Sequence, residues 1–234
     1  MFKIEKAIKL EDLNILHLWD GFGISEAVKF INEGKADGIN FNFTKNFPSN
    51  INEVKNSLAL KYLQINDYTW EFDYSAINYL SSLECLCIYT TDKKEINYSN
   101  YPNLKKTALY WRPKAKSLFE CKHLESLFIG KYTEHDLSSF EGLNNLKFLR
   151  INTGSVRSLK GIEKLQNLEK LWLAQATKLE NISGVEKLQN LKTLWIDNCK
   201  NIKNFEVLKG LKTTIDLKIF GTTSKPDWLN EEIL

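Results

Sequence analysis

Apolar and polar residues alternate in a short segment that recurs along the chain with the pattern L-x-x-L-x-L, where x is any residue. The clearest copies begin at Leu60, Leu83, Leu124, Leu146, Leu168 and Leu191. Weaker copies begin at Leu13, Ala36, Leu104 and Thr214, so that successive copies lie 20 to 24 residues apart. Because side chains alternate between the two faces of a strand, the pattern predicts about ten short strands, each apolar on one face.

The segments between the strands have a different apolar spacing, close to three residues. After the copy at Leu146, apolar side chains follow at Val156, Leu159, Ile162 and Leu165. Such a spacing favours short 3₁₀ turns over long α-helices. An asparagine marks a turn before several strands, at Asn103, Asn145, Asn167 and Asn190. One strand with one return cannot bury its apolar face alone, so we expect neighbouring units to stack around one continuous core.

One unit recurs almost unchanged, because residues 161–168 are repeated at residues 184–191, an offset of 23 residues. In its period and its leucine pattern the chain resembles a leucine-rich repeat protein, and its 22–23-residue units most resemble the bacterial internalin-like class. This resemblance implies an α/β solenoid shaped as a curved arc. About ten short parallel strands would line the concave face, with irregular or 3₁₀ returns on the convex face.

The chain departs from this family at the ninth position of the unit, where the family usually places Asn or Cys. Cys199 matches that preference. The other ninth positions hold Thr91, Arg112, Tyr132, Gly154 and Ala176. We therefore expect irregular bends after the strands, and the curvature of the arc stays open.

The repeat crosses the middle of the chain without a linker, so we predict one domain over residues 1–234. Residues 1–35 would form an N-terminal cap and the first unit, residues 36–213 the repeats, and residues 214–234 the last strand and a C-terminal cap. Residues 1–12 and 25–33 are expected to be partly helical, with Ser25 as the N-cap of the second stretch. Residues 226–229 and 233–234 are expected to fold over the last unit.

The resemblance implies that the residue between the last two leucines of each unit points away from the core and onto the concave face. Read along the chain, this outward column is His17, Asn40, Gln64, Cys87, Ala108, Phe128, Arg150, Trp172, Trp195 and Lys218. Columns two residues away add Tyr62, Phe148, Lys170, Tyr89, Tyr110 and Asp197. Half of these positions in the second half of the chain are aromatic, although Lys or Ser could stand there. Soluble proteins seldom expose contiguous apolar patches without a partner, and Trp, Tyr and Arg are enriched at binding hot spots.

We therefore predict a partner-binding surface on the concave face. Its residues are Phe128, Phe148, Arg150, Trp172, Trp195, Tyr110, Lys170 and Asp197. In the alternative interpretation, the rings shield the strand backbone or pack on one another in a monomer. The pattern itself leaves that alternative open.

The charge of the chain is nearly balanced, with 32 basic and 29 acidic residues and a net charge of +3. This balance does not favour a purely electrostatic nucleic-acid binder. Residues 146–213 are more basic, with 13 basic and 6 acidic residues. A solvated convex face is the favoured explanation of that excess, and steering of an acidic partner and a nucleic-acid surface are the alternatives.

Signals for catalysis or for a metal are few. The three histidines, His17, His123 and His135, lie far apart in the sequence. Cys85-x-Cys87 places two thiols on one strand face, as a soft-metal pair would, although no second pair completes a tetrahedral zinc site. A glycine-rich phosphate loop is absent from the sequence. We expect no catalytic residue, no metal and no cofactor.

The sequence has no apolar run long enough for a membrane span, and its opening residues lack the apolar stretch of a signal peptide. We expect a cytoplasmic protein with reduced thiols. The favoured function is a non-catalytic protein-interaction module with an aromatic concave face. Its role would be that of a regulator or scaffold, or of an immunity protein that blocks a toxin domain. The alternatives are a metal-binding or enzymatic protein that uses Cys85 and Cys87, and a nucleic-acid binder that uses residues 146–213.

Overall fold

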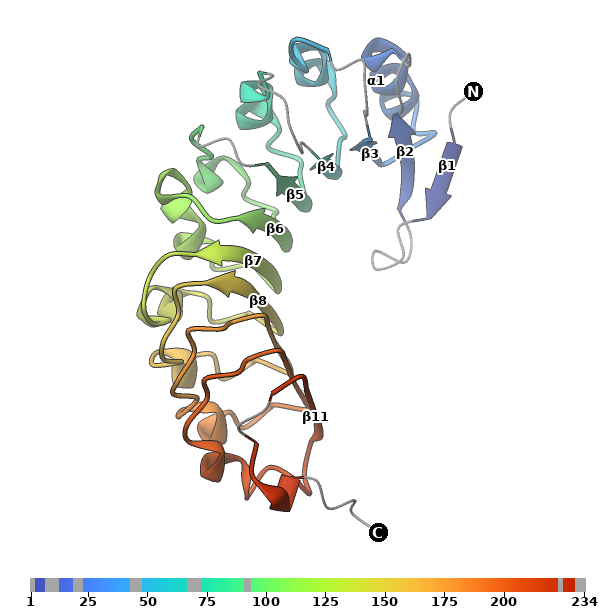
Figure 1. The fold of residues 1–234 in the computed structure, drawn as a ribbon. Helices are drawn as coiled ribbons and strands as arrows, with labels where there is room; N and C mark the ends of the chain where they lie inside the picture. The colour runs from blue at the N-terminus through green and yellow to red at the C-terminus, as the bar shows by residue number, and fades with distance from the viewer. Residues whose placement is uncertain are drawn as a thin grey trace. The chain divides into compact units, whose positions relative to one another are not determined.

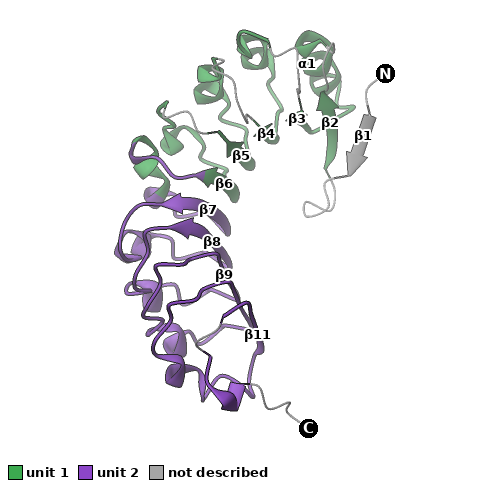
Figure 2. Ribbon diagram, in the orientation of Figure 1, with its two compact units in different colours: residues 1–109, 114–118 green, residues 110–113, 119–234 purple. Residues whose placement is uncertain are grey.

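The fold comes from a computed structural model. It describes residues 3–6, 13–18, 23–42, 48–66, 73–90, 94–222 and 225–229. The chain forms two compact units (Figure 2). Unit 1 contains residues 1–109 and 114–118, and unit 2 contains residues 110–113 and 119–234. We describe each unit by itself.

Unit 1 begins with an antiparallel strand pair, β1 (Lys3–Lys6) and β2 (Asn14–Leu18), in which Ile4 lies opposite Leu16. The strands from β2 to β6 then pair in parallel and follow the order of the chain. The remaining elements are α1 (Ile24–Asn32), β3 (Gly38–Phe41), η1 (Asn52–Asn56), β4 (Tyr62–Asn66), η2 (Ser75–Tyr79), β5 (Cys85–Tyr89), η3 (Tyr98–Asn100) and β6 (Lys106–Tyr110). The 3₁₀ helix η4 (Pro113–Glu120) contains residues of both units.

Unit 2 is a stack of five parallel strands, paired in chain order. Each strand is followed by a short 3₁₀ helix, which lies on the side of the unit opposite the strands (Figure 1). The elements are β7 (Ser126–Tyr132), η5 (Ser138–Gly142), β8 (Phe148–Gly154), η6 (Ile162–Lys164), β9 (Lys170–Ala174), η7 (Val185–Lys187), β10 (Thr193–Asp197), η8 (Phe205–Leu208), β11 (Asp216–Phe220) and η9 (Asp227–Leu229).

The leucine positions form the core of both units, as the repeat predicts. Leu149, Leu171 and Leu194 lie in register on neighbouring strands and are at most 1% exposed. Ile162 and Leu165, on the return after β8, are also fully buried. Within the described residues, the strands from β2 to β11 each have a parallel neighbour, the return after β2 is the α-helix α1, and the later returns contain 3₁₀ helices. The predicted solenoid of parallel strands and 3₁₀ returns is therefore confirmed.

The N-terminal cap differs from the prediction in two ways. Residues 3–6 form a strand instead of part of a helix, because their backbone pairs with β2. The N-cap of α1 is Gly23 instead of Ser25, and the Ser25 hydroxyl donates a hydrogen bond to the Glu53 carboxylate. Ser25 thus joins α1 to the next return. The rest of the expected helix over residues 1–12 lies outside the described residues.

At the C-terminal end, residues 225–229 lie against the return side of unit 2. The Trp228 indole N–H donates to the Glu206 carboxylate at 3.3 Å, and the Lys212 ammonium donates to the Trp228 carbonyl at 2.5 Å. The described part of the expected cap therefore covers the η8 turn. Residues 230–234, which include the rest of that expected cap, lie outside the described residues.

The bends after the strands of unit 2 are regular, and the expectation of irregular bends is wrong for this unit. The eighth residue of each successive unit adopts a left-handed backbone, with φ between 53° and 60° at Lys131, Thr153, Gln175, Asn198 and Gly221. Backbone hydrogen bonds between neighbouring units stabilise this conformation. For example, the Gln175 N–H donates to the Asp197 carbonyl at 2.7 Å. The bend therefore needs no ninth-position Asn, and buried residues such as Tyr132 and Cys199 fill that position.

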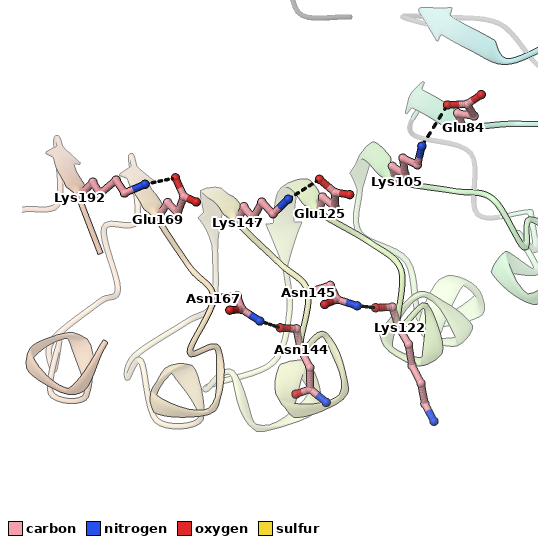
Figure 3. A network of polar contacts seen from close by, with 10 residues as sticks. All are labelled: Glu84, Lys105, Lys122, Glu125, Asn144, Asn145, Lys147, Asn167, Glu169 and Lys192. Carbon is pink, nitrogen blue, oxygen red and sulfur yellow. Dashed lines mark hydrogen bonds and ion pairs between the residues drawn. The ribbon is translucent and has the colours of Figure 1, made fainter. Parts of the chain in front are cut away.

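A different asparagine ladder joins the units, at the turns that precede the strands. The side-chain amides of Asn145, Asn167 and Asn190 each donate at 2.8 Å to a backbone carbonyl one unit earlier. Beside this ladder, lysines pair with glutamates of the preceding unit, at 2.9 Å for Lys147–Glu125 and 2.8 Å for Lys192–Glu169 (Figure 3). Three of the four predicted turn asparagines therefore also serve as links between units.

Candidate protein-binding surface

The predicted outward column lies in register along the strands of unit 2. Phe128 on β7 is opposite Arg150 on β8, which is opposite Trp172 on β9. Trp172 is in turn opposite Trp195 on β10, and Trp195 is opposite Lys218 on β11. These five residues, which we call the stacked row, are one residue out of phase with the buried leucines. The L-x-x-L-x-L pattern therefore predicts their common face correctly.

Neighbouring side chains of the stacked row contact one another. The Arg150 guanidinium lies 3.7 Å from the centroid of the Trp172 ring and 5.1 Å from that of Phe128. The rings of Trp172 and Trp195 meet edge to face, with centroids 5.3 Å apart and an interplanar angle of 75°. The Lys218 ammonium lies 4.9 Å from the Trp195 centroid. Cation–π contacts of this kind contribute about 0.5–2 kcal/mol each.

The stacked row is neither buried nor fully exposed. Phe128, Arg150, Trp172 and Trp195 are half-buried, and Lys218 is exposed. The mutual packing proposed as the alternative interpretation therefore exists. It orders the side chains while part of each stays accessible, so the same contacts prearrange a surface at low entropic cost on binding.

The other predicted binding residues flank the stacked row. Phe148 and Lys170 lie opposite each other on β8 and β9, where Phe148 is half-buried and Lys170 is exposed. Asp197, at the end of β10, accepts a hydrogen bond of 2.7 Å from the Asn198 side chain. Tyr110 lies beneath the Lys131 ammonium, which is 4.9 Å from the centroid of its ring.

Sequence reasoning missed several residues of this surface. A Cβ atom at Gly130 would lie 2.7 Å from Cδ1 of Tyr110, so glycine is needed there for the ring to pack on β7. Asp216 accepts the indole N–H of Trp195 at 3.4 Å and forms an ion pair of 3.2 Å with Lys218. Phe220 is 58% exposed and lies in register with Asp197. The column of outward residues that contains Asp197 continues at Phe220 in the next unit, so extending that column by one unit identifies Phe220.

The strand face of unit 1 is chemically different, because amide side chains such as Asn40 and Gln64 occupy outward positions that hold rings in unit 2. Asn66 donates to the Asn40 side chain at 3.1 Å, and Gln64 donates to Asn66 at 3.0 Å. Asn42 approaches Nδ1 of His17 at 3.1 Å. These contacts link β2, β3 and β4 through their outward residues. Unit 1 therefore presents a polar network where unit 2 presents stacked rings.

The two thiols of the predicted soft-metal pair lie side by side, with 3.9 Å between the sulfurs of Cys85 and Cys87. The hydrogen bond to Cys87, together with burial, raises the pKa of Cys85 well above its usual value. Within the described residues, no group of three or more His, Cys, Asp and Glu side chains is arranged to hold a metal ion.

Several basic residues of the segment 146–213 form ion pairs with carboxylates of the same segment. Lys203 contacts Glu180 at 2.5 Å, and Lys209 contacts Glu206 at 2.6 Å. Hydrogen bonds from these lysines hold the pKa values of Glu180 and Glu206 below their usual range. Among the described residues, no helix is long and apolar enough to cross a membrane.

Comparison with known families identifies the repeat directly. Residues 166–210 match the family model for leucine-rich repeats in two copies. The chain has the leucine-rich repeat fold. A search of the curated proteins finds no match. The segment that matches includes β9 and β10, which carry Trp172 and Trp195 of the stacked row.

Solved structures resemble the fold over most of the chain. An internalin (inlF) from Listeria monocytogenes aligns with a TM-score of 0.61 and 18% identity, over 82% of this chain and 63% of that one. The chain thus spans less than two thirds of the length of that protein. Internalin C2 (inlC2) from the same species aligns with a TM-score of 0.50 and 17% identity, over 88% of this chain and 80% of that one.

At these identities the likeness shows the fold alone, and at that level the expected internalin-like repeat is confirmed. Leucine-rich repeats generally act as non-enzymatic scaffolds that bind other proteins through extended surfaces. The fold therefore suggests a protein-interaction module.

Proposed function

We propose that this chain is a non-catalytic binding module that contacts a partner protein through the strand face of unit 2. The stacked row is the observation that carries the proposal. Its rings and its guanidinium are ordered by one another and stay half-exposed. Rigid aromatic and arginine side chains of this kind form the centres of protein interfaces.

The dimensions of the row suit an interface centre. Parallel strands lie about 4.8 Å apart, so five residues on successive strands span about 19 Å. A standard interface buries about 800 Å² on each partner. Phe148, Lys170 and Phe220 extend the surface around the row, and they would supply part of the remaining area.

The charges on this face favour an acidic partner. Lys131, Arg150, Lys170 and Lys218 all lie on or beside the row. The acidic groups on this face are Asp197 and Asp216, and Asp216 pairs with Lys218, so positive charges outnumber negative ones around the row. A partner that presents carboxylates would meet cations held over aromatic rings, where a planar guanidinium binds a carboxylate in two places.

Within this function, we propose a cytoplasmic protein in one of two roles. It is either a regulator or scaffold, or an immunity protein that neutralises a toxin domain. The two roles predict different neighbouring genes, because an immunity protein is encoded beside its toxin. Sequencing around the gene separates them: an adjacent gene for a secreted toxin supports immunity, and its absence supports a regulator.

The test is capture of the partner followed by calorimetry on variants. Trp172→Ala removes the central ring of the row, and we expect affinity to fall by about 2 kcal/mol or more, close to thirtyfold. Two controls alter return-side residues, Lys164→Ala and Tyr79→Ala. Tyr79 is 69% exposed, so Tyr79→Ala removes an aromatic ring as Trp172→Ala does, but at a site away from the row. Both controls should bind as the parent does.

The outcome that contradicts the proposal is a larger loss for Lys164→Ala than for Trp172→Ala, which would move the site to the basic returns. If nucleic acid copurifies with the chain and its affinity falls steeply with salt concentration, the partner is a nucleic acid instead of a protein. A stoichiometric metal that is lost in Cys87→Ser would instead favour the metal-binding alternative.

A further inference from the structure

The last described strand, β11, leaves two core side chains partly exposed, whereas the preceding strands of unit 2 bury theirs. Leu194 and Ile196 on β10 are fully buried. Their partners in register on β11, Leu217 and Ile219, are only half-buried. Within the described residues, β11 pairs with β10 along one edge and with no strand along the other. Its free edge presents unpaired backbone groups beside apolar side chains, which is the arrangement that recruits another strand.

The described C-terminal segment is bonded elsewhere. Trp228 is held by Glu206 and Lys212, on the return side of the unit. In unit 1, by contrast, the first parallel strand is flanked by an antiparallel strand, because β1 pairs with β2. This fold therefore accepts an antiparallel strand at the edge of its parallel stack.

We propose that β11 pairs antiparallel with β11 of a second copy of this chain, about a two-fold axis that passes through Leu217. Residues directly opposite each other in an antiparallel pair lie on the same face of the sheet. A two-fold axis through a residue therefore keeps core residues opposite core residues. Interfaces with two-fold symmetry use one self-complementary patch, and they are the commonest between identical chains.

The charges of β11 select the axis at Leu217 over the neighbouring positions. With the axis at Leu217, Asp216 lies opposite Lys218 of the second copy, and this pair occurs twice. Ile215 then lies opposite Ile219, and both are half-buried in the single chain. An axis at Lys218 would instead oppose two lysines, and like charges directly across an antiparallel pair are destabilising. An axis at Ile219 would oppose Lys218 with Phe220.

The surface involved is small, so the association is expected to be weak compared with that of obligate dimers. The pairing would join the sheets of the two copies along their β11 edges. Asp216 would lie close to the two-fold axis, and Trp195 would lie near it as well, because its indole donates a hydrogen bond to Asp216. This inference does not depend on the proposed function. Failure of either test leaves the other unaffected.

Sedimentation over a wide range of concentration tests the pairing by exchanging charges. The parent chain should associate reversibly to a dimer. Asp216→Lys and Lys218→Asp each place like charges opposite one another, and we expect each to weaken the dimer about tenfold or more. The double variant restores opposite charges and should regain the parent affinity. Lys164→Asp changes the net charge as Lys218→Asp does, but on the return side, and should leave the dimer unchanged.

Crosslinking provides a second measurement that does not depend on the charge variants folding well. Leu217→Cys places a thiol on the axis, opposite its own copy, where Cα atoms about 4.5–5.5 Å apart permit a disulfide. Lys218→Cys is its matched control and should crosslink far less. A chain that stays monomeric at every concentration overturns the proposal. So does a double charge variant that associates as weakly as the single ones.

Discussion

At the scale of single residues, the bends of unit 2 hold side chains in a backbone conformation that they rarely adopt. Gln175 has φ 53° and an exposed side chain, and its N–H is fixed by the Asp197 carbonyl. Left-handed backbone costs a residue with a Cβ about 1–2 kcal/mol, and glycine avoids that cost. We expect Gln175→Gly to raise the free energy of unfolding by about 1 kcal/mol, measured in urea.

The same substitution elsewhere is the control. Gln189 is exposed, and its φ is not among the positive ones. There, glycine adds only freedom to the unfolded chain, so Gln189→Gly should lower stability by about 0.5–1 kcal/mol. Equal effects of the two changes would mean that the left-handed bend carries no strain.

The two faces of a strand should respond differently to truncation. Leu171 is 1% exposed in the core, whereas its neighbour Trp172 is half-buried within the stacked row. Leu171→Ala should cost about 2–5 kcal/mol, because it leaves a cavity. Trp172→Ala should cost less, since it removes contacts at the surface. Thermal unfolding of both variants checks this order, and comparable losses would contradict the assigned register.

At the scale of elements, short polar side chains initiate the 3₁₀ returns. Asp73 and Asp136 each accept a hydrogen bond from the backbone N–H two residues later, at 2.8 Å from Ser75 and 2.9 Å from Ser138. These bonds hold the pKa of both carboxyls below their usual value. Asn181 makes the same bond to Ser183 in a later unit, so the acceptor matters more than its charge.

This turn predicts how stability varies with pH. Because the pKa of Asp136 is lower in the folded chain, its contribution is complete above the unfolded pKa of about 3.9 and is lost as pH falls through the folded value. Asp136→Asn keeps an acceptor and should show a smaller loss of stability in acid than the parent. Urea unfolding from neutral pH down to about pH 3 measures this difference, and parallel curves for the two proteins would refute it.

The elements also show what the pattern could and could not predict. Period and phase predicted which residues are buried, and hence that Arg150 lies between Phe128 and Trp172, because a strand fixes faces by alternation alone. The bend could not be predicted, since its left-handed position holds Lys, Thr and Gln as well as the Asn and Gly that favour that conformation. The contact of Tyr110 with Gly130 could not be predicted either, because it depends on how a ring packs across neighbouring strands. The strand β1 was not predicted, because four residues are too few for an alternating apolar pattern to distinguish a strand from a helix.

At the scale of the whole molecule, the two units do not separate along the sequence. Residues 110–113 belong to unit 2 and residues 114–118 to unit 1, so the chain passes between the units three times between residues 109 and 119. A single cut cannot release either unit intact. The prediction of one domain thus has a direct test. Limited proteolysis should yield no stable fragment of residues 1–103 or 124–234, and recovery of one with its own sharp unfolding transition would contradict it.

Adjacent units of this chain are close to interchangeable. Gly161 and Gly184 have nearly identical backbone angles, 99° and −21° against 103° and −24°. In both, the N–H donates to the glutamate two residues later, at 2.9 Å and 2.8 Å. Excising the 23 residues 168–190 would join Asn167 to Leu191 at equivalent points. A unit can thus be duplicated or deleted within the gene without disturbing the junction between its neighbours. The length of the strand face can therefore evolve through changes in the number of units.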